Sequence, residues 1–422
     1  MASGTSMVNM TRTAGTVRGG GLALVVAAAR PRPSLRIDLP VTIISLCSVL
    51  YSRYWHAATS LCDNNRAKHA EDTAKMAVGM LAPVLVLSTG RCGSTMVSDI
   101  LNRHPGILSV SEFFSFVGPR AFVGRRPSGE HMWRLYSRPG RPIRRLKHFG
   151  IPGEFLYPLD DPAARFSLDD LPPILAITMP HLTAEYYDLY DECGAVVRAQ
   201  PRQSPADHHR HFFEWLAGRL GRRVWVERSG GSLLWGSRLL GAFPDARVIH
   251  VYRDGRDTAL SMSRHPPFRV MLAIRNQLKP LGLDPMNWVG SASGWVVALL
   301  DGLAGALVRP ERLRLDRVSL PDFAWFWSRM IEMGDDLFGH FPSDRLLNVA
   351  FEDVQASPES EIRRIVRFIS PELEDDAWLS TVSSIPRKTT SKFPSLGADE
   401  RAAVAEACRP GLERLGYPIH AY

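Results

Sequence analysis

The sequence of 422 residues is poor in cysteine and has no close cysteine pair. Its five cysteines are widely spaced: Cys47, Cys62, Cys92, Cys193 and Cys408. A set that is odd in number and lacks a C-x-x-C pair indicates neither a zinc site nor a disulfide framework. We therefore expect a reducing compartment, the cytoplasm.

Residues 1–82 lack an apolar run long enough to cross a membrane. The run at 39–51 falls well short of the roughly 20 residues that a spanning helix needs. A shorter run at 20–29 follows two arginines and ends in three alanines, which is the outline of a signal peptide. We interpret residues 1–82 as a separable extension. A targeting segment, a membrane-associated segment and a partly disordered tail stay open as its nature.

Neither sign of charge dominates the chain, which has 51 Lys and Arg against 43 Asp and Glu and a formal net charge of +8. With 45% hydrophobic and 22% charged residues, the composition is that of a globular protein. The basic excess favours a polyanionic partner. Charge alone does not choose among nucleic acid, an acidic membrane surface and a phosphate-rich cosubstrate.

Short apolar runs alternate with helical patterns from residue 83 onward. The strand-like runs lie at 84–87, 223–226, 246–252 and 345–349. Strands separated by helices predict an α/β fold with a central parallel sheet flanked by helices. We interpret 83–422 as one domain, with inserts rich in Arg, Pro and Gly at about 116–171 and 265–320.

A glycine-containing turn, S-T-G-R-C-G-S-T-M at 88–96, follows the first expected strand and opens a helix. Glycines let the backbone approach an anion, and the helix N-terminus supplies N–H groups and positive potential. The turn predicts a phosphate or sulfate site, with a ligand-free turn as the alternative. It is not the G-x-x-x-x-G-K-[ST] loop of nucleoside triphosphatases, because only two residues separate Gly90 from Gly93 and the cation Arg91 precedes the second glycine.

A second charged turn, Y-R-D-G-R-D at 252–257, follows the strand expected at 246–252 and precedes another helix. Asp254 or Asp257 can cap that helix. Arg253 and Ser261 can converge on one anion. A surface cluster of Arg and Asp is the alternative interpretation.

Together the two turns resemble those of the family of sulfotransferases that use PAPS (3′-phosphoadenosine 5′-phosphosulfate). The resemblance spans about residues 83–418 and implies a three-layer, P-loop-like α/β fold. It implies that the first turn binds the 5′-phosphosulfate and the second the 3′-phosphate. The residues implied at the first site are Arg91, Cys92, Gly93, Ser94, Thr95 and Met96, and those at the second are Arg253 and Ser261.

Three further segments resemble the same family. W-V-E-R-S at 225–229 is similar to its W-x-E-K-[TS] segment, with Arg228 where Lys is usual. F-E-D-V at 351–354 is similar to its Y-E-D-L segment. T-S-K-F at 390–393 resembles its C-terminal nucleotide clamp, which implies a donor contact by Lys392.

The resemblance implies sulfonate transfer from PAPS to a hydroxyl of a carbohydrate, lipid or other small-molecule acceptor, without a metal ion. Arg91 and Arg228 would offset charge on the leaving phosphate. Glu112 stands where bacterial and carbohydrate-acting members have their general base. Other members use a His after the second expected strand, where this chain has Gly230 and Gly231.

Several alternatives to these assignments stay open. Glu112 could merely order its loop by pairing with Arg228 or Arg256. The whole chain could be an atypical P-loop kinase or a non-catalytic protein that binds PAPS or another anion.

Two segments bear on the acceptor. Nine Lys or Arg residues at 120–147 form either a solvated face or a docking surface for an acidic acceptor or anionic lipid. The apolar stretch at 286–308 is either a buried helix or a lid over a lipid-like acceptor. We expect no nucleic acid partner and leave peripheral membrane contact open. The histidines at 208–211 are interpreted as the solvated start of a helix rather than a metal site.

Overall fold

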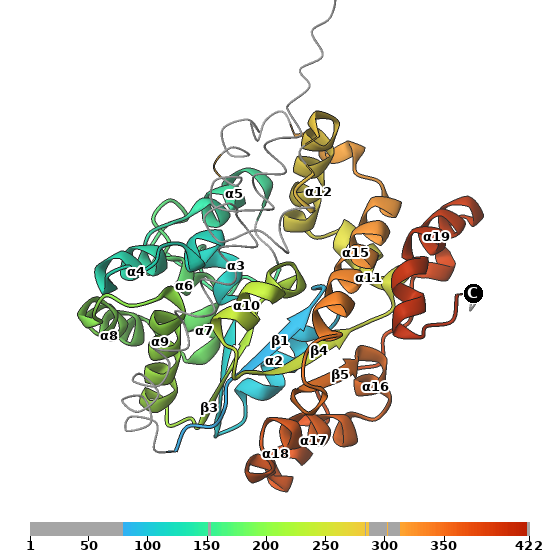
Figure 1. Cartoon of the computed structure of the whole chain (residues 1–422). Coiled ribbons are helices and arrows are strands. Elements are labelled where there is room, and N and C mark those ends of the chain that lie inside the picture. Colours follow the sequence, from blue (N-terminus) through green and yellow to red (C-terminus); the bar gives the residue numbers. More distant parts are fainter. Residues whose placement is uncertain (1–78, 151–152, 283, 287–301, 303–312, 420–422) are drawn as a thin grey trace, which may run out of the picture. The chain divides into compact units, whose positions relative to one another are not determined.

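The computed structural model describes residues 79–150, 153–282, 284–286, 302 and 313–419. A sheet of five parallel strands lies at the centre of these residues (Figure 1). The strands are β1 (Val84–Ser88), β2 (Ile107–Ser111), β3 (Val224–Arg228), β4 (Arg247–Tyr252) and β5 (Leu346–Ala350). Their order across the sheet is β2-β3-β1-β4-β5. Because the strands are parallel, their carboxyl ends meet at one edge, where open α/β sheets bind ligands.

Helices connect the consecutive strands, follow the last strand and cover the sheet (Figure 1). Those before β3 are α2 (Ser94–Asn102), α3 (Phe113–Val117), α4 (Gly129–Ser137), α5 (Arg141–Phe149), α6 (Pro173–Ala176), α7 (Thr178–Leu182), α8 (Tyr186–Ala199) and α9 (Pro205–Arg219). Those between β3 and β5 are α10 (Gly236–Ala242), α11 (Gly255–Ser263), α12 (Pro266–Leu278) and α15 (Leu320–Phe338). Those after β5 are α16 (Phe351–Ala356), α17 (Pro358–Ile369), α18 (Asp376–Val382) and α19 (Ala398–Leu415).

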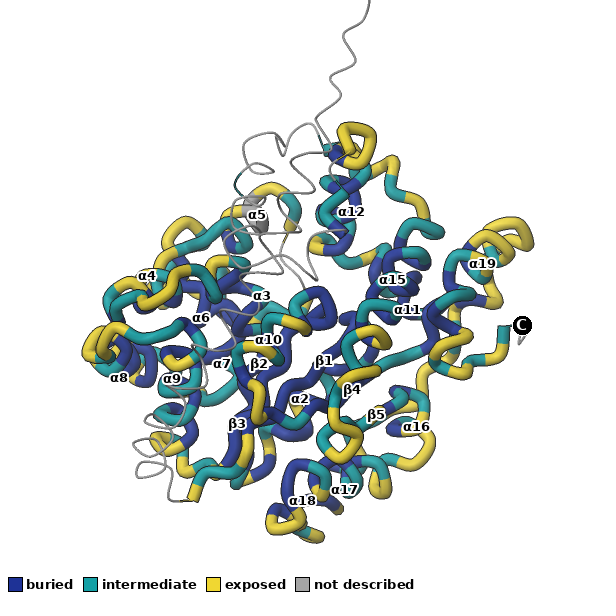
Figure 2. The backbone as a smooth tube through the Cα atoms, viewed as in Figure 1, coloured by how far each residue is buried: buried dark blue, intermediate teal, exposed yellow. Residues whose placement is uncertain are grey.

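The side chains of β1 point alternately into two separate layers of the apolar core. Val84 and Val86 pack with residues of α2 and α17, whereas Leu85 and Leu87 pack with residues of α9 and α15. Successive side chains of a strand point to opposite faces, so the two clusters lie on the two faces of the sheet. Figure 2 shows the strands buried among the helices. The predicted parallel sheet flanked by helices is therefore confirmed.

The expected insert at 116–171 contributes to the core. Trp133 and Tyr136 of α4 are buried, and the Tyr136 hydroxyl lies 2.8 Å from Nδ1 of His209 on α9. The other ring nitrogen of His209 lies 2.8 Å from the carbonyl oxygen of Ala121. His208 is also buried. The interpretation of this histidine cluster as a solvated helix start is thus wrong for its first two members, which attach α9 to the insert.

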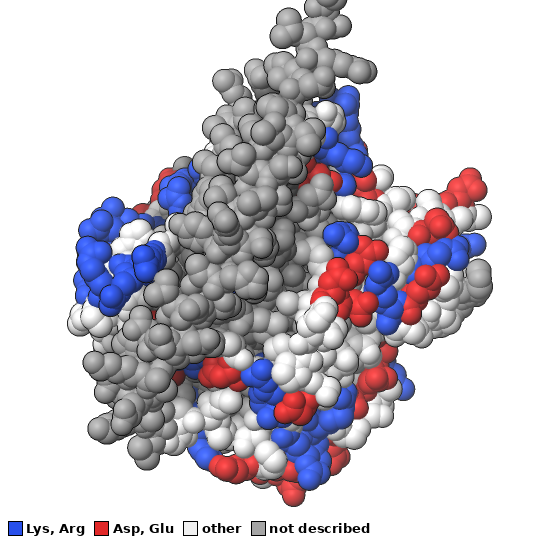
Figure 3. All heavy atoms as spheres, viewed as in Figure 1, with Lys and Arg blue, Asp and Glu red and all other residues white. Residues whose placement is uncertain are grey.

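The exposed basic side chains of the 120–147 run include Arg125, Arg134 and Arg144. Lys and Arg gather on the side of the molecule where Figure 1 shows α4 (Figure 3). Apart from residues 286 and 302, the apolar stretch at 286–308 lies outside the described residues, as do residues 1–78 of the extension. Within the described part of the chain, no helix combines the length and apolarity needed to span a bilayer.

Candidate active site

The turn between β1 and α2 contains three left-handed residues, Gly90, Arg91 and Gly93. φ is +58° at Arg91 and +85° at Gly93, and a Cβ atom at Gly93 would lie 2.1 Å from the ring of Phe351. Gly93 is therefore required both by conformation and by space. α2 begins at the next residue, and the first N–H groups of a helix have no intrahelical acceptor. Together with the hydroxyls of Ser94 and Thr95, these N–H groups can bind an anion.

Two of the predicted loop residues direct their side chains into the core. Cys92 is fully buried, with its sulfur 3.2 Å from the carbonyl oxygen of Val251. Met96 is partly buried and packs against the apolar cluster on the α2 side of the sheet. At both positions, the backbone is the part that can face a ligand.

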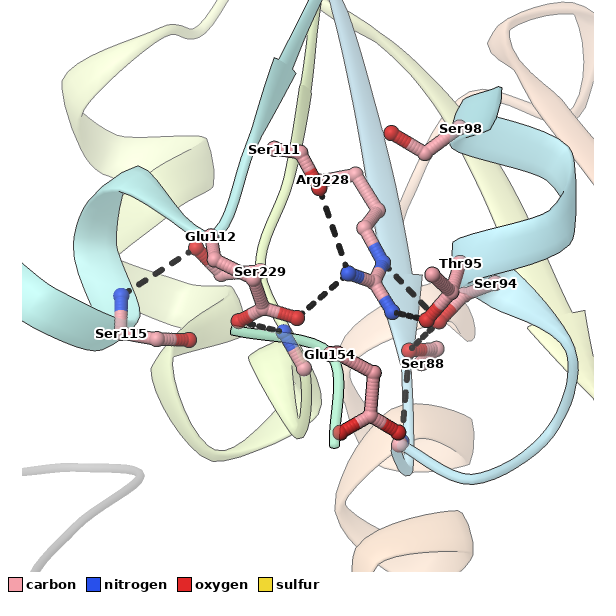
Figure 4. A network of polar contacts seen from close by, with 12 residues as sticks. Ser88, Ser94, Thr95, Ser98, Ser111, Glu112, Ser115, Glu154, Arg228 and Ser229 are labelled. Atoms are coloured by element: carbon pink, nitrogen blue, oxygen red, sulfur yellow. Dashed lines mark hydrogen bonds and ion pairs between the residues drawn. The ribbon is translucent and has the colours of Figure 1, made fainter. Parts of the chain in front are cut away.

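Arg228, the last residue of β3, joins this loop to the end of β2 (Figure 4). Its Nε donates to Ser94 Oγ at 3.1 Å, its Nη2 donates to Thr95 Oγ1, and its Nη1 forms an ion pair with Glu112. The Arg228 side chain is only 5% exposed. A rigid guanidinium fork thus connects Ser94 and Thr95 with Glu112.

Glu112 lies between β2 and α3 with a left-handed φ of +57°. Its backbone N–H donates to the carbonyl of Arg228 at 2.7 Å, and its Oε2 accepts the N–H of Gly230 at 2.9 Å. A Cβ atom at Gly230 would lie 3.2 Å from Glu112 Oε1, so the glycine leaves room for the carboxylate. Left-handed non-glycine residues are strained by about 1–3 kcal/mol and cluster at functional sites. The sequence suggested Arg228 or Arg256 as the partner of Glu112, and in the structure Glu112 pairs with Arg228.

A buried acid supports the helix that follows Glu112. The Ser229 hydroxyl donates to Oε1 of Glu227 at 2.6 Å. Ser229 Oγ in turn accepts the N–H groups of Phe114 and Ser115 at 3.1 and 3.3 Å, in the first turn of α3. Glu227 is fully buried, and this burial raises the pKa of its carboxyl to about 8. The acid orients Ser229, and Ser229 fixes the start of α3 beside Glu112.

Arg91 belongs to a second charged cluster. Its Nε donates to Ser261 Oγ at 3.1 Å, and its Nη1 forms an ion pair with Glu154. The other carboxylate oxygen of Glu154 lies 3.2 Å from Nε2 of His265. The hydrogen bond from His265 and the contact with Arg91 hold the pKa of Glu154 well below its ordinary value. Arg91 therefore links the first loop with Ser261 while it shares its charge with a carboxylate.

The turn after β4 begins α11 with a capping residue. The Asp254 carboxylate accepts the backbone N–H of Arg256 at 2.9 Å and pairs with the guanidinium of the same residue at 2.6 Å. The expected cap at Asp254 is confirmed. Arg256 is buried in this pair and is not the partner of Glu112.

Arg253 and Lys392 meet at Asp257. The Arg253 guanidinium lies 3.7 Å from the Asp257 carboxylate and 4.8 Å from the ring centroid of Phe351. The same carboxylate accepts the backbone N–H of Lys392 at 3.0 Å. The C-terminal segment and the second turn are thus adjacent, and Ser261 connects α11 with Arg91 of the first loop.

The polar groups around Glu112 border a cavity of about 210 Å³. It is lined by Thr95, Asp99, Ser111, Glu112, Glu154, Leu156, Ile177, His181 and Arg228. Two of these residues end β2 and β3, so the cavity lies at the carboxyl edge of the sheet. A molecule in it would contact Glu112 and Arg228 at the same time.

Sequence reasoning missed Asp99, Glu154 and His181. Only Asp99 carried a signal, since it follows Thr95 by four positions on one helix and such residues share a face. Glu154 and His181 lie in segments without a motif, and only the fold brings them to the cavity.

Comparison with known proteins assigns a family to this arrangement. The model described as the sulfotransferase family matches residues 83–288. Over these residues the chain is similar to the sulfotransferase family. The matched segment contains both loops, Glu112 and Arg228. Sulfonate transfer is the activity of this family, whose sulfonate donor is PAPS.

Solved sulfotransferase structures are also similar to the chain, whereas no curated protein matches it. The sulfotransferase domain from the curacin biosynthetic pathway is 12% identical, covering 80% of this chain and 99% of that one, with a TM-score of 0.38. A sulfotransferase from Mycobacterium avium is 14% identical, covering 84% and 81%, with a TM-score of 0.39. Retinol dehydratase in complex with androsterone and the inactive cofactor PAP is 11% identical, covering 82% and 85%, with a TM-score of 0.34.

Proposed function

We propose that the chain transfers a sulfonate group from PAPS to a hydroxyl group of a small acceptor, with Glu112 as the general base. The observation that carries this proposal is the position of Arg228. Separate nitrogen atoms of its guanidinium contact Ser94 and Thr95 of the first loop and the carboxylate of Glu112. A donor at the loop and a hydroxyl at Glu112 would therefore meet at one fixed cation.

The first loop offers the groups that a phosphosulfate requires: helix N-terminal N–H groups, two hydroxyls and guanidinium charge. Arg91 pairs with Glu154, so the donor would displace or share that carboxylate. For the 3′-phosphate we propose Arg253 and Ser261, with Lys392 contributing from the C-terminal segment. This site would distinguish PAPS from adenylates that lack a 3′-phosphate.

The proposed reaction forms a bond between the acceptor oxygen and sulfur. Glu112 takes the hydroxyl proton as that bond forms. The bond between sulfur and the bridging oxygen breaks, and this oxygen keeps the electron pair as part of the product PAP (3′,5′-adenosine bisphosphate). Arg91 and Arg228 offset the charge that grows on it. Arginine does not lose its proton in proteins, so both residues would stabilise charge rather than act as acids. Because these two cations offset the charge, the proposed reaction requires no metal ion.

The variant Glu112→Gln tests this assignment, because it keeps the shape of the side chain and removes the base. We expect transfer of labelled sulfonate from PAPS to methyl glycosides, para-nitrophenol or decanol to fall by about 10²–10⁴-fold. The affinity for PAP in calorimetry should not fall, because Glu112→Gln also removes a carboxylate that shares the charge of Arg228. Glu413→Gln, which changes an exposed carboxylate on α19, is the matched control. Undiminished transfer by Glu112→Gln would contradict the proposed base, and a wild-type protein that does not bind PAP would contradict the donor.

A further inference from the structure

The cavity beside Glu112 is lined by polar groups from several elements of the fold. Thr95, Glu112 and Arg228 line the wall where, on the proposed function, the reacting hydroxyl would meet the donor. Asp99 and His181 line the cavity as well, and the proposed chemistry does not use them. Groups beyond the reaction centre in an acceptor site are those that select the acceptor.

Asp99 offers hydrogen-bond acceptors to the cavity. It lies one turn after Thr95 on α2, and its side chain is half exposed. Burial of its remaining surface raises the pKa of its carboxyl, and the Arg228 charge counteracts this effect. The nearest imidazole is that of His181, whose Nδ1 lies 3.6 Å from Asp99 Oδ1.

His181 is a neutral neighbour at physiological pH. Its side chain is 7% exposed, and burial together with the nearby Arg228 lowers its pKa to about 4. Its Nε2 lies 3.4 Å from the Ser98 hydroxyl. At neutral pH, Asp99 therefore faces an uncharged ring that provides one N–H donor and one acceptor.

The size of the cavity limits the acceptor. A volume of about 210 Å³ is below the range of about 300–1,000 Å³ typical of pockets for drug-sized ligands. Among the described residues that line the cavity, Leu156 and Ile177 are the apolar ones. A fitting molecule is compact, has several hydroxyls for the polar walls and has one apolar patch for these two residues.

From these features we infer that the cavity binds a neutral sugar ring and that Asp99 and His181 select it by hydrogen bonds to hydroxyls beside the reacting one. A phenol or fatty alcohol has no second hydroxyl beside the reacting one, so it would offer these two groups no hydrogen bond. An anionic acceptor would meet the carboxylates of Asp99, Glu112 and Glu154. This inference rests on the proposed function and narrows its acceptor.

A panel of acceptors tests the inference with PAPS labelled in its sulfonate group. The sugar members are methyl glucoside, methyl galactoside and methyl mannoside. Para-nitrophenol and decanol represent the phenols and fatty alcohols, and methyl glucuronide adds a carboxylate to the same ring. At least one neutral glycoside should be sulfated about tenfold or more faster than every other class.

Variants of Asp99 separate recognition from folding. Asp99→Ala should raise the KM for the best glycoside by about 10- to 100-fold, the expected effect of losing a hydrogen bond to a charged group, with kcat nearly unchanged. Asp99→Asn, which still accepts a hydrogen bond, should restore part of the loss. Asp336→Ala, which changes an exposed carboxylate on α15, is the control and should behave like the wild type.

The outcomes of these experiments distinguish a wrong acceptor from a wrong donor. Equal or faster sulfation of para-nitrophenol, decanol or the glucuronide overturns the inference, and so does an unchanged KM in Asp99→Ala. A protein that binds PAP but sulfates none of the neutral glycosides also overturns it, while the donor assignment stands. A protein that does not bind PAP refutes the proposed function itself, and the inference fails with it.

Discussion

Replacing Glu227 with glutamine should make the protein more stable than the wild type at alkaline pH. Glu227 is fully buried behind the loop of Glu112, and burial raises its pKa from 4.5 to about 8. Between these two values the folded protein binds a proton that the unfolded chain has released. The stabilising effect of the neutral acid is therefore complete below about pH 4.5 and is lost as the pH rises through 8.

The size of this effect follows from the two pKa values. A full separation between 4.5 and about 8 corresponds to an upper limit of about 4–5 kcal/mol in the free energy of unfolding. Relaxation around the ionised acid reduces it, so we expect about 2–4 kcal/mol. Glutamine cannot ionise, and its Oε1 can still accept the hydrogen bond of Ser229.

Urea denaturation of both proteins between pH 5 and pH 9 measures the difference directly, because all other titrating groups are common to the pair. Near pH 5 the two should agree within about 1 kcal/mol. The difference should then grow in favour of Glu227→Gln up to about pH 8. A difference that stays constant, or that grows in favour of the wild type, would refute the assignment of a neutral buried acid.

Three other changes follow from the same contacts. Glu154→Gln should tighten PAP binding by about three- to tenfold in calorimetry, because Arg91 no longer shares its charge with a carboxylate; unchanged or weaker binding would argue against competition. Gly93→Ala should lower the free energy of unfolding in urea by about 2–4 kcal/mol, since its Cβ would overlap the Phe351 ring at a left-handed φ, and wild-type stability would show that the loop adapts. Burial lowers the pKa of His209 to about 3, so unfolding takes up a proton and the free energy of unfolding should fall as the pH drops below about 6.5. His209→Phe should make the free energy of unfolding in urea depend less on pH over this range. An unchanged dependence would be evidence against a neutral buried His209.

The apolar runs of the sequence predicted β1, β3, β4 and β5 but not β2. In β2 the run I-L-S-V-S contains two serines, which interrupt the pattern of a buried strand. Both serines are nevertheless buried, because Ser109 hydrogen-bonds to Ser98 at 2.8 Å and Ser111 accepts from Arg228 at 3.4 Å. A polar residue in a strand therefore indicates an exposed position only where the protein interior offers its side chain no hydrogen-bond partner.

His208 and His209 are also polar residues that the structure buries although the sequence suggested exposure. Adjacent histidines before a helix suggested a solvated start, but the carbonyl groups of Ala121 and Pro127 lie within hydrogen-bond distance of their rings. Those partners are more than eighty positions away in the sequence. Local patterns do not report such distant partners.

At the site, the motif-bearing segments were predictable and the others were not. Arg91, Ser94 and Thr95 follow a strand in a loop with glycines, and Arg228 ends another strand, so their convergence follows from a parallel sheet. Glu154 comes from the insert at 116–171, where nothing in the local sequence indicates that it will pair with Arg91.

The most direct test of the donor assignment is calorimetry with PAP, 5′-AMP and ATP with magnesium. The proposed 3′-phosphate site predicts that PAP binds about 100-fold or more tightly than 5′-AMP, the expected effect of a phosphate held by charge-assisted hydrogen bonds. Arg253→Ala should remove most of this preference. Equal affinity for PAP and 5′-AMP, an unchanged preference in Arg253→Ala, or stronger binding of ATP with magnesium would contradict the account.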